Sequence, residues 1–575
     1  MILATTAIKD YWGDSKELLL AGEWCKLGND RYLVNRNYKI VGYPWNDRKR
    51  LYSAYVYTKL KYKIILPILV DWLNCYHNKS YSVKYWDIRL GLWLRYYIQI
   101  LYDHYNVIKD ALEYKKGLKT IITKEINIIP NDFNEFFGLY TTDHLYNFNL
   151  FCQIIEICFE KSKIICVDVK KSSLKDVIVN NQKVMSRLNK IGLRIPIFKS
   201  IDNNLCYYAP GYNFSREAVN ALTNCMVPTI GVGNEINVDN IEINYNERKT
   251  ELNIPIEEEF DEIISKTIKK HIPKTYLECD NNFELYFSHK FKKPPKYFIT
   301  GNPIIGNENL KTIIALACEE SKTKLVLHQH GGQYGAAKIY PLEDHETSIS
   351  DYYLTWGWKS SKENIKPHNS IIHFKKRKIS LKKQRILILS VSSPPYTKYF
   401  YSAPLSSQIT GEFQMLIKAL DGVKLKIRKN TYFRLKKEYG WGENKMIKST
   451  FPEIQLETTK KKLSKSLSST SLCIVTYNAT VLLESFSMNV PTLLFWKKEY
   501  REIRDDAVKY YNMLENIGIL HFEPESFSEK INDIADEPVK WWSETNVQTA
   551  KDEFLSYFCR PRTKLFTNYK SIINK

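Results

Sequence analysis

The stretch His328-Gln329-His330-Gly331-Gly332-Gln333-Tyr334-Gly335 directly follows the apolar run Leu325-Val326-Leu327. An apolar run of this kind predicts a short buried strand. Open α/β sheets bind ligands at the carboxyl ends of their strands, where glycines let backbone N–H groups approach an anion closely. Histidine carries or donates a proton near neutral pH. The stretch therefore predicts a functional site at a strand end; the alternative is an ordinary glycine-rich turn with two exposed histidines.

A second strand-end pattern lies farther along the chain. The run Leu472-Cys473-Ile474-Val475 predicts a buried strand, and it leads through Thr476-Tyr477-Asn478-Ala479-Thr480 into a predicted helix that contains Glu484. Hydroxyl and amide side chains at a helix start make a phosphate site. Glu484 lies one helical turn after Thr480, where a carboxylate accepts hydrogen bonds from ribose hydroxyls. A plain N-cap with a surface glutamate is the alternative, but the combination favours nucleotide binding.

Length and charge limit the class of protein. At 575 residues the chain is long enough for two or three domains, and its 44% hydrophobic and 26% charged content is that of a globular protein. The net charge of +21 suggests an anionic partner such as a phosphate group, an acidic glycan, nucleic acid or a membrane surface. The sequence carries no nucleic-acid-binding signature, so we expect no nucleic acid partner.

Cysteine usage and the chain start indicate the compartment. The eleven cysteines are scattered and form no CxxC pair, which is typical of reduced thiols in the cytosol. The start Met1–Thr6 lacks the basic region of a signal peptide, and the apolar segment Lys61–Tyr76 is interrupted by Pro67 and Asp71. We expect a cytoplasmic protein whose basic patches allow peripheral contact with the inner membrane.

The first half begins as an α/β domain and becomes helical. Ile2–Ala4 and Leu18–Ala21 predict strands, and helical patterns dominate from about residue 47 to 113. An aromatic stripe in that region predicts core packing, and it comprises Trp86, Leu90, Trp93, Tyr97 and Leu101. Arg89 shares this face, where a charged side chain needs a partner or a ligand.

A strand–helix–strand unit precedes the histidine stretch. Tyr297–Thr300 and the Leu325 run predict two strands joined by a helix through Lys311–Leu316, which implies a parallel sheet. Asp351–Trp358 predicts the next strand, and a basic linker follows over residues 366–383. Beyond the linker, Ile386–Ser390 and Leu425–Arg428 predict strands of a second α/β domain.

These patterns predict the domain organisation. We expect an N-terminal α/β domain over residues 1–375 with an insertion at about 161–290, and a second α/β domain over 384–545. A helical tail over 546–575 is expected to pack back on the junction.

This layout resembles the GT-B glycosyltransferases, in which two Rossmann-like domains face a cleft, here with a helical insertion in the first. The chain also resembles the surface-polysaccharide transferases encoded in bacterial O-antigen clusters. The matching segments are Leu3–Ala7, Leu20–Cys25, Gln329–Gly332, Leu354–Trp358, Tyr477–Glu484, Trp541-Trp542 and Val547-Gln548.

The loop Gln329-His330-Gly331 is similar to one in capsule transferases that use CMP-activated 3-deoxy acid sugars. It also resembles the HG loop of teichoic-acid polyol-phosphate polymerases. The resemblance implies a metal-independent glycosyltransferase of bacterial surface polysaccharide or glycoconjugate synthesis. It implies a nucleotide-sugar donor, first of all a CMP-activated acidic sugar of the nonulosonic type, and a glycan or lipid-linked glycan acceptor.

Roles follow for the first strand end and for the acceptor side. His330 is expected to act as base on the acceptor hydroxyl or as acid toward the leaving phosphate. Gln329, Gly331 and Gly332 are expected to hold a phosphate or a sugar carboxylate. Glu23 is a candidate base or nucleophile on the acceptor side, with a raised pKa if it is buried and unpaired. A satisfied structural carboxylate is the alternative for Glu23.

On the donor side, Thr476, Asn478 and Thr480 are expected to cap the phosphate, with Glu484 on the ribose. Arg428, predicted to end a strand, is expected to neutralise the leaving group. The second-tier candidates are His328, Arg89, Glu346 and Asp351.

The run Glu343-Asp344-His345-Glu346 resembles a metal cluster, but no DxD motif accompanies it and most acidic runs are solvated loops. GT-B enzymes commonly dispense with metal, so we expect no metal and no cofactor besides the nucleotide-activated substrate. Two alternatives remain open: a CDP-polyol phosphate transferase of the teichoic-acid type, and a non-enzymatic glycan- or lipid-binding assembly protein.

Overall fold

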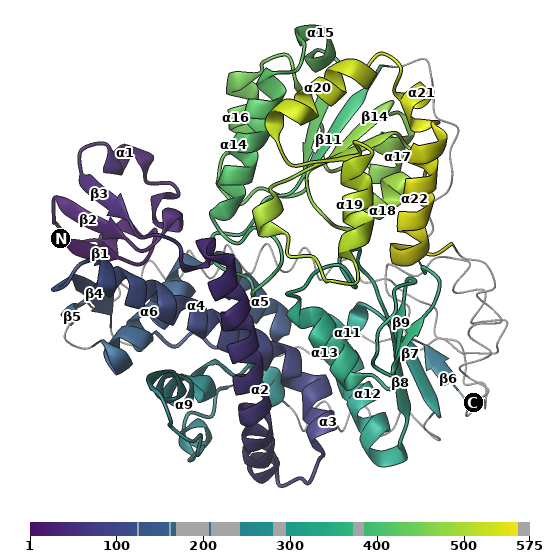
Figure 1. Cartoon of the computed structure of the whole chain (residues 1–575). Helices are drawn as coiled ribbons and strands as arrows, with labels where there is room; N and C mark the ends of the chain where they lie inside the picture. The colour runs from purple at the N-terminus through teal and green to yellow at the C-terminus, as the bar shows by residue number, and fades with distance from the viewer. Residues whose placement is uncertain are drawn as a thin grey trace.

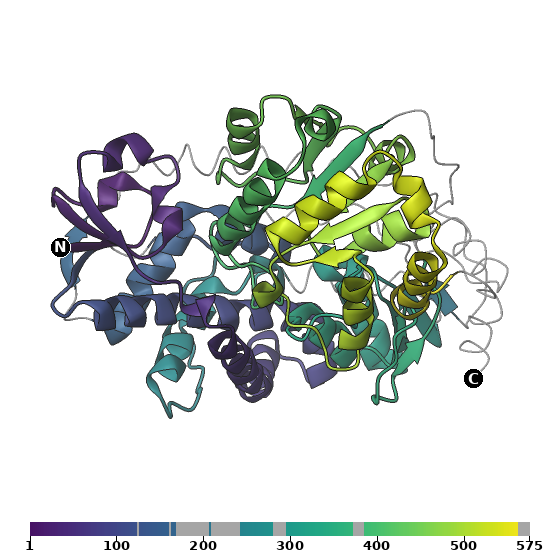
Figure 2. The same ribbon diagram turned by 45° about the horizontal axis from the view of Figure 1, so that its top comes forward.

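Three separate parallel β-sheets organise the chain in a computed structural model (Figures 1 and 2). The structure describes residues 1–123, 126–159, 163–167, 206–208, 242–279, 295–371 and 384–561. Most of the expected insertion, most of the basic linker and the tail beyond residue 561 lie outside the described residues.

The N-terminal sheet has the strand order β3-β2-β1-β4-β5, and all of its strand pairs are parallel. Its strands are β1 (Ile2–Ala4), β2 (Glu17–Leu20), β3 (Asn37–Ile40), β4 (Lys119–Thr123) and β5 (Lys163–Val167). The chain builds outward from β1 to β3 and then crosses to the other side of β1. This Rossmann-like order creates a topological switch point between β1 and β4.

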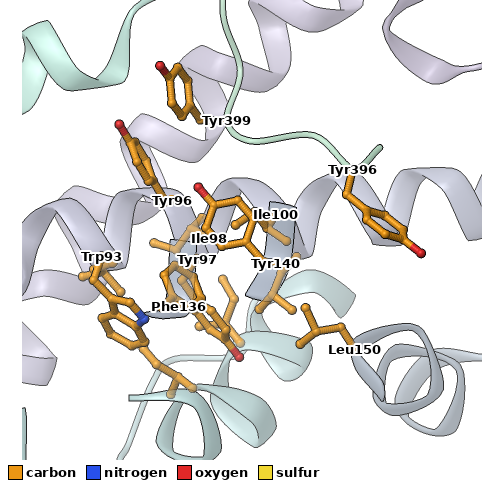
Figure 3. Close-up of a cluster of buried hydrophobic side chains, with 14 of the residues drawn as sticks. Trp93, Tyr96, Tyr97, Ile98, Ile100, Phe136, Tyr140, Leu150, Tyr396 and Tyr399 are labelled. Atoms are coloured by element: carbon orange, nitrogen blue, oxygen red, sulfur yellow. The ribbon is translucent and has the colours of Figure 1, made fainter. Parts of the chain in front are cut away.

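Helices, several of them long, lie between the N-terminal sheet and the second sheet of the molecule (Figure 1). They are α2 (Arg48–His77), α3 (Val83–Trp86), the π-helical turn η4 (Asp87–Gly91), α4 (Leu92–Tyr114), α5 (Phe133–Thr142), α6 (His144–Cys158) and α9 (Glu259–His271). The Asp47 side chain caps α2, and Asn78 ends it in the left-handed conformation at φ 52°. The predicted aromatic core is confirmed, since Trp93 and Tyr97 are fully buried and stack at 5.2 Å (Figure 3).

The middle sheet has the order β10-β9-β8-β7-β6 and is also parallel throughout. Its strands are β6 (Cys206–Tyr208), β7 (Tyr297–Thr300), β8 (Lys324–His328), β9 (Tyr352–Thr355) and β10 (Ile365–Pro367). Helix α12 (Glu308–Ser321) joins β7 to β8, and α13 (Pro341–Ile349) precedes β9. The strand–helix–strand unit before the histidine stretch is therefore confirmed.

The C-terminal sheet has the order β13-β12-β11-β14-β15-β16, again Rossmann-like, with a switch point between β11 and β14. Its strands are β11 (Ile386–Ser390), β12 (Thr431–Leu435), β13 (Gln455–Leu456), β14 (Leu472–Val475), β15 (Thr492–Phe495) and β16 (Leu520–His521). The helices around it are α14 (Gln408–Asp421), α15 (Leu425–Arg428), α16 (Glu443–Thr450), α17 (Leu463–Ser468), α18 (Thr480–Ser487), α19 (Val508–Asn516), α20 (Pro524–Ile534), α21 (Pro538–Trp542) and α22 (Thr545–Phe558).

Short helical turns complete the described chain. They are η1 (Lys9–Tyr11), η2 (Glu23–Lys26), α1 (Asp30–Leu33), η3 (Pro44–Asn46), η6 (Glu247–Lys249), η7 (Lys274–Tyr276), α11 (Pro303–Gly306) and η8 (Lys498–Tyr500). Within the described part of the chain, no helix combines the length and the apolar character needed to cross a membrane.

The predicted α/β class with two Rossmann-like domains is confirmed by the N-terminal and C-terminal sheets. Residues 1–375, expected to form one domain, carry two sheets rather than one. The prediction that Leu425–Arg428 is a strand is wrong, because this segment forms α15 and β12 begins at Thr431. A four-residue apolar segment does not distinguish a strand from a helical turn.

Ion pairs and backbone hydrogen bonds join the C-terminal part to the preceding parts. Arg48, at the start of α2, donates to both oxygens of Glu502, at 2.5 and 2.9 Å. Ala337 and Ile503 form an antiparallel bridge beside this pair. After α22, the Arg560 N–H donates to the Trp356 carbonyl at 2.6 Å, so the end of the described chain returns to the middle sheet.

Candidate functional site

The carboxyl edge of the C-terminal sheet holds a pocket at its switch point. Ser390 ends β11 and Thr476 follows β14, and their hydroxyl oxygens lie 3.1 Å apart. Both residues line a pocket that Glu412 from α14 and Trp496 after β15 also border. Arg501 pairs with the buried Glu412 at 2.9 Å. Open α/β sheets bind ligands at such a point.

Helix α18 begins at this edge, with Thr480 as its first residue. Ala479 is the N-cap residue, and no described side chain makes the capping hydrogen bond. Asn478, expected to cap the helix, instead donates from its amide to the Tyr511 hydroxyl at 2.7 Å. Glu484 lies one turn along α18 and is half-buried, as the sequence pattern predicts.

The glycine-rich loop after β8 contacts the start of α18. The Gly332 N–H donates to the Thr480 hydroxyl at 3.0 Å, which joins residues 148 positions apart in the sequence. A Cβ atom on Gly332 would lie 2.5 Å from the Thr480 backbone nitrogen. Glycine is therefore the residue that permits this approach of two backbones. The two predicted strand-end sites come from different sheets and meet at this contact.

His330 forms a dyad with Glu346 of α13. Its Nε2 lies 2.7 Å from Glu346 Oε1 and 2.8 Å from the Tyr334 hydroxyl. The second carboxylate oxygen of Glu346 accepts a hydrogen bond from the Tyr353 hydroxyl at 3.1 Å. Glu346 is 1% exposed and His330 is 9% exposed, so only the histidine retains access to solvent. A buried carboxylate that orients an imidazole is the arrangement of a positioned general base.

The Gln329 side chain makes hydrogen bonds within the protein. Its amide oxygen accepts hydrogen bonds from the Trp356 N–H and the Trp358 indole, at 2.8 and 2.7 Å. Its amide nitrogen donates to the Gly331 carbonyl at 2.7 Å. The side chain is fully buried, and these bonds hold the glycine-rich loop against the chain after β9.

His328 belongs to the interior rather than to the site. It is fully buried at the end of β8, and its ring packs edge-on against His368 at 5.3 Å. Burial, followed by the neighbouring His368, lowers the pKa of His328 well below its usual value. His328 therefore stays neutral, and His330 is the histidine of the pair that reaches the surface.

The acidic run on α13 makes protein contacts. Glu343 accepts hydrogen bonds from the Gly335 N–H at 2.8 Å and from Arg504 at 3.0 Å. Burial raises the pKa of Glu343 to about 7. Asp344 pairs with Lys59 of α2 at 2.8 Å. Over the residues that the structure describes, no group of three or more His, Cys, Asp or Glu side chains is placed to hold a metal ion.

Three predicted residues lie away from these strand ends. Arg428 precedes β12, at the amino edge of its sheet, and it pairs with Glu453 at 2.6 Å. Asp351 precedes β9 and accepts hydrogen bonds at 2.7–2.8 Å from Lys84 and the Leu325 N–H, at the edge opposite His330. Arg89 is buried in η4, where it donates to the Tyr85 hydroxyl at 3.0 Å. Arg428 and Asp351 each pair with an opposite charge, and Arg89 hydrogen-bonds to neutral groups of the protein.

Glu23 lies at the carboxyl edge of the N-terminal sheet but is neither buried nor unpaired. Its side chain is 39% exposed and pairs with Lys26 at 3.0 Å. Next to it, the Trp24 ring packs on Tyr396 at 5.5 Å. A Cβ atom added to Gly440, after β12, would lie 3.7 Å from the Leu27 side chain. The carboxyl edges of the two Rossmann-like sheets therefore face one another through these loops.

Solved structures offer only distant similarity. The crystal structure of TarM is similar at 12% identity with a TM-score of 0.34, over 51% of this chain and 57% of TarM. The wall teichoic acid polymerase TagF is similar at 10% identity with a TM-score of 0.30, over 71% of this chain and 98% of TagF. MurG from Acinetobacter baumannii is similar at 8% identity with a TM-score of 0.33, over 65% of this chain and 99% of MurG.

No curated protein matches the chain at a significant level. The sequence pattern of the LIC12162 family transferases, in contrast, matches residues 1–568, which is nearly the whole chain. The protein therefore belongs to the LIC12162 family of transferases.

Proposed function

We propose that this transferase moves a sugar from a nucleotide donor to a glycan acceptor in the synthesis of a bacterial surface polysaccharide or glycoconjugate. The observation that carries the proposal is the contact between Gly332 and Thr480. It brings the His330–Glu346 dyad of the middle sheet to the helix start of the C-terminal sheet. The proposed proton-transfer group and the proposed anion-binding element would thus come together from two sheets.

The donor nucleotide is proposed to bind at the carboxyl edge of the C-terminal sheet. The first N–H groups of a helix lack partners within the helix and favour an anion such as phosphate. Helix α18 offers such groups, because no described side chain caps it. The Gly332 N–H is directed at the same Thr480. The phosphate would bind at this helix start, with the ribose hydroxyls on Glu484 one turn along.

His330 is proposed to move the proton. In this proposal His330 carries its proton on Nε2 and donates it in a hydrogen bond to Glu346, so that the lone pair lies on Nδ1. Nδ1 would take the proton of the acceptor hydroxyl as its oxygen bonds to the anomeric carbon. The bond from that carbon to the nucleotide phosphate breaks, and its electron pair leaves with the phosphate. The helix start of α18 would stabilise the charge that develops there.

A CMP-activated acidic sugar is the proposed donor, and the similarity of the loop Gln329-His330-Gly331 to capsule transferases supports this choice. The proposed acceptor is a glycan or a lipid-linked glycan. We further propose that the protein works in the cytoplasm, with its net charge of +21 favouring contact with the anionic face of the inner membrane.

A nucleotide panel and a transfer assay test the proposal. CMP, CDP, UMP, UDP and GDP are each added to the full chain, since a ligand that binds only the folded state raises its melting temperature. The release of nucleotide from CMP-N-acetylneuraminate is then followed with and without a glycan acceptor. His330→Ala should lower the rate by roughly 100-fold or more while nucleotide affinity stays unchanged. Failure of every nucleotide to stabilise the protein would contradict the proposal.

A further inference from the structure

The loop after β11 crosses from the C-terminal sheet to the helices of the N-terminal part and is fastened there. The Thr397 hydroxyl donates to Asp103 of α4 at 2.8 Å, and the Phe400 N–H donates to Gln99 of the same helix at 3.0 Å. The Lys398 carbonyl accepts a hydrogen bond from the Tyr140 hydroxyl at 2.6 Å. The backbone on both sides of Lys398 is therefore held in place.

Aromatic packing fixes the same loop further. Tyr399 stacks on Tyr96 of α4 at 4.7 Å, and Figure 3 shows the two rings side by side. Tyr401 packs edge-on against Tyr399 at 5.3 Å. Both rings of the loop are buried, so they form a rigid support.

The Lys398 ammonium sits on this support without a counter-charge. Its Nζ lies 5.1 Å from the ring centre of Tyr399 and 4.9 Å from that of Tyr401. No described carboxylate comes within ion-pair distance of it. Burial, followed by the charge of Lys436, lowers the pKa of Lys398 to about 8. A half-buried cation that lacks an anion is costly, so its retention points to a ligand.

Lys436 supplies the second charge. It follows β12 directly, and its N–H donates to the Ser390 carbonyl at the end of β11. Its side chain is exposed, and no described carboxylate pairs with it. The two lysines thus come from the loops that follow β11 and β12. Strand β12 pairs with β11 on the side away from β14, and β14 is the strand that leads into α18. Two like charges at the carboxyl edge of the sheet have no described neighbour that offsets them.

We propose that Lys398 and Lys436 form an oxyanion subsite that binds a phosphate or a carboxylate of the substrate. The place of this subsite in the reaction rests on the proposed function, because it lies at the same sheet edge as the proposed nucleotide site. An oxyanion there offsets the repulsion between the two ammonium groups and accepts their hydrogen bonds. The fastened loop holds Lys398 in position before the ligand arrives, which lowers the cost of binding.

Calorimetric titration of the full chain at low salt tests the subsite with two probes. Inorganic pyrophosphate represents phosphate, and N-acetylneuraminic acid represents a sugar carboxylate. Lys398→Met keeps the length of the side chain and removes its charge, and Lys436→Met does the same at the second position. Lys437→Met is the matched control, because Lys437 is also an exposed lysine, lying over the Tyr439 ring at 4.5 Å.

Each subsite variant should bind the recognised probe roughly tenfold or more weakly than the unaltered protein does, as expected for a lost charged hydrogen bond. Lys437→Met should bind the probe as tightly as the unaltered protein. Weaker binding of pyrophosphate by the variants identifies phosphate as the ligand group. Weaker binding of N-acetylneuraminic acid alone identifies carboxylate. Equal binding in all variants, or no binding of either probe to the unaltered protein, overturns the subsite.

Nucleotide titrations of the same variants separate this proposal from the proposed function. If no nucleotide binds while a probe still depends on Lys398, the donor function fails and the subsite stands. If nucleotides bind but neither lysine substitution changes any titration, the subsite fails and the donor function stands. The melting temperature of each variant shows that its fold is intact.

Discussion

Replacing Gly332 by alanine should separate the glycine-rich loop from helix α18. The added Cβ would lie 2.5, 2.6 and 2.7 Å from three backbone atoms of Ala479 and Thr480, and backbone atoms cannot rotate aside. Overpacking of this kind costs roughly 1–3 kcal/mol, and the lost hydrogen bond to Thr480 adds about 1 kcal/mol. The local contact should therefore weaken by roughly 2–4 kcal/mol, which corresponds to an equilibrium change of roughly 30-fold or more.

Hydrogen exchange measures this change locally, which suits a chain of 575 residues for which two-state unfolding is not expected. Exchange over residues 329–335 and 476–484 should accelerate in Gly332→Ala. Gly331→Ala is the control, because a Cβ there meets only ring carbons of Tyr334, at 3.2 and 3.5 Å, and a ring can shift slightly. Equal protection in the two variants would refute the argument that backbone proximity holds the two sites together.

Three further results are expected. Glu346→Gln should lower turnover roughly tenfold or more, because the amide no longer fixes the charge and tautomer of His330. Nucleotide affinity should stay unchanged. An unchanged pH–rate profile would count against this role of Glu346. Glu484→Ala should weaken nucleotide binding by roughly 1–3 kcal/mol in a calorimetric titration, and wild-type affinity would remove Glu484 from the site. Burial lowers the pKa of His271 to about 3 and that of His368 to about 4, so the folded state resists a proton that the unfolded chain accepts below pH ~6.5. Each of these two histidines should lower the free energy of unfolding by about 2 kcal/mol at pH 5 relative to pH 7. In His271→Gln, the free energy of unfolding measured from denaturation curves should depend less steeply on pH. The same pH dependence in the variant and the unaltered protein would contradict this prediction.

Apolar runs that are buried on both faces could be predicted from the sequence. Ile386–Ser390 and Leu472–Val475 are strands at the predicted places, because a strand inside a parallel sheet is apolar throughout. Strand β3 (Asn37–Ile40) escaped prediction, since it lies at a sheet edge with alternating exposed residues. The division of residues 1–375 into two sheets depends on strand pairing, which periodicity does not contain.

The candidate site was predictable as two halves but not as a whole. The composition of each strand end indicated His330 and Thr480, whereas their proximity through Gly332 depends on the packing of two domains. The hydrogen bonds of Gln329 could not be predicted, because its backbone partner Trp356 and its indole partner Trp358 lie 27 and 29 residues away in the sequence. Lys436 was missed because β12 was placed at Leu425–Arg428, which shifted the predicted strand end.

We propose, above all, that the carboxyl edge of the C-terminal sheet binds the donor nucleotide. A crystal structure of the full chain with the nucleotide that raises its melting temperature most tests it directly. We expect a phosphate at the start of α18, beside Gly332 and Thr480, with a ribose hydroxyl on Glu484. A nucleotide bound at another sheet edge, with no phosphate at the start of α18, would contradict this placement.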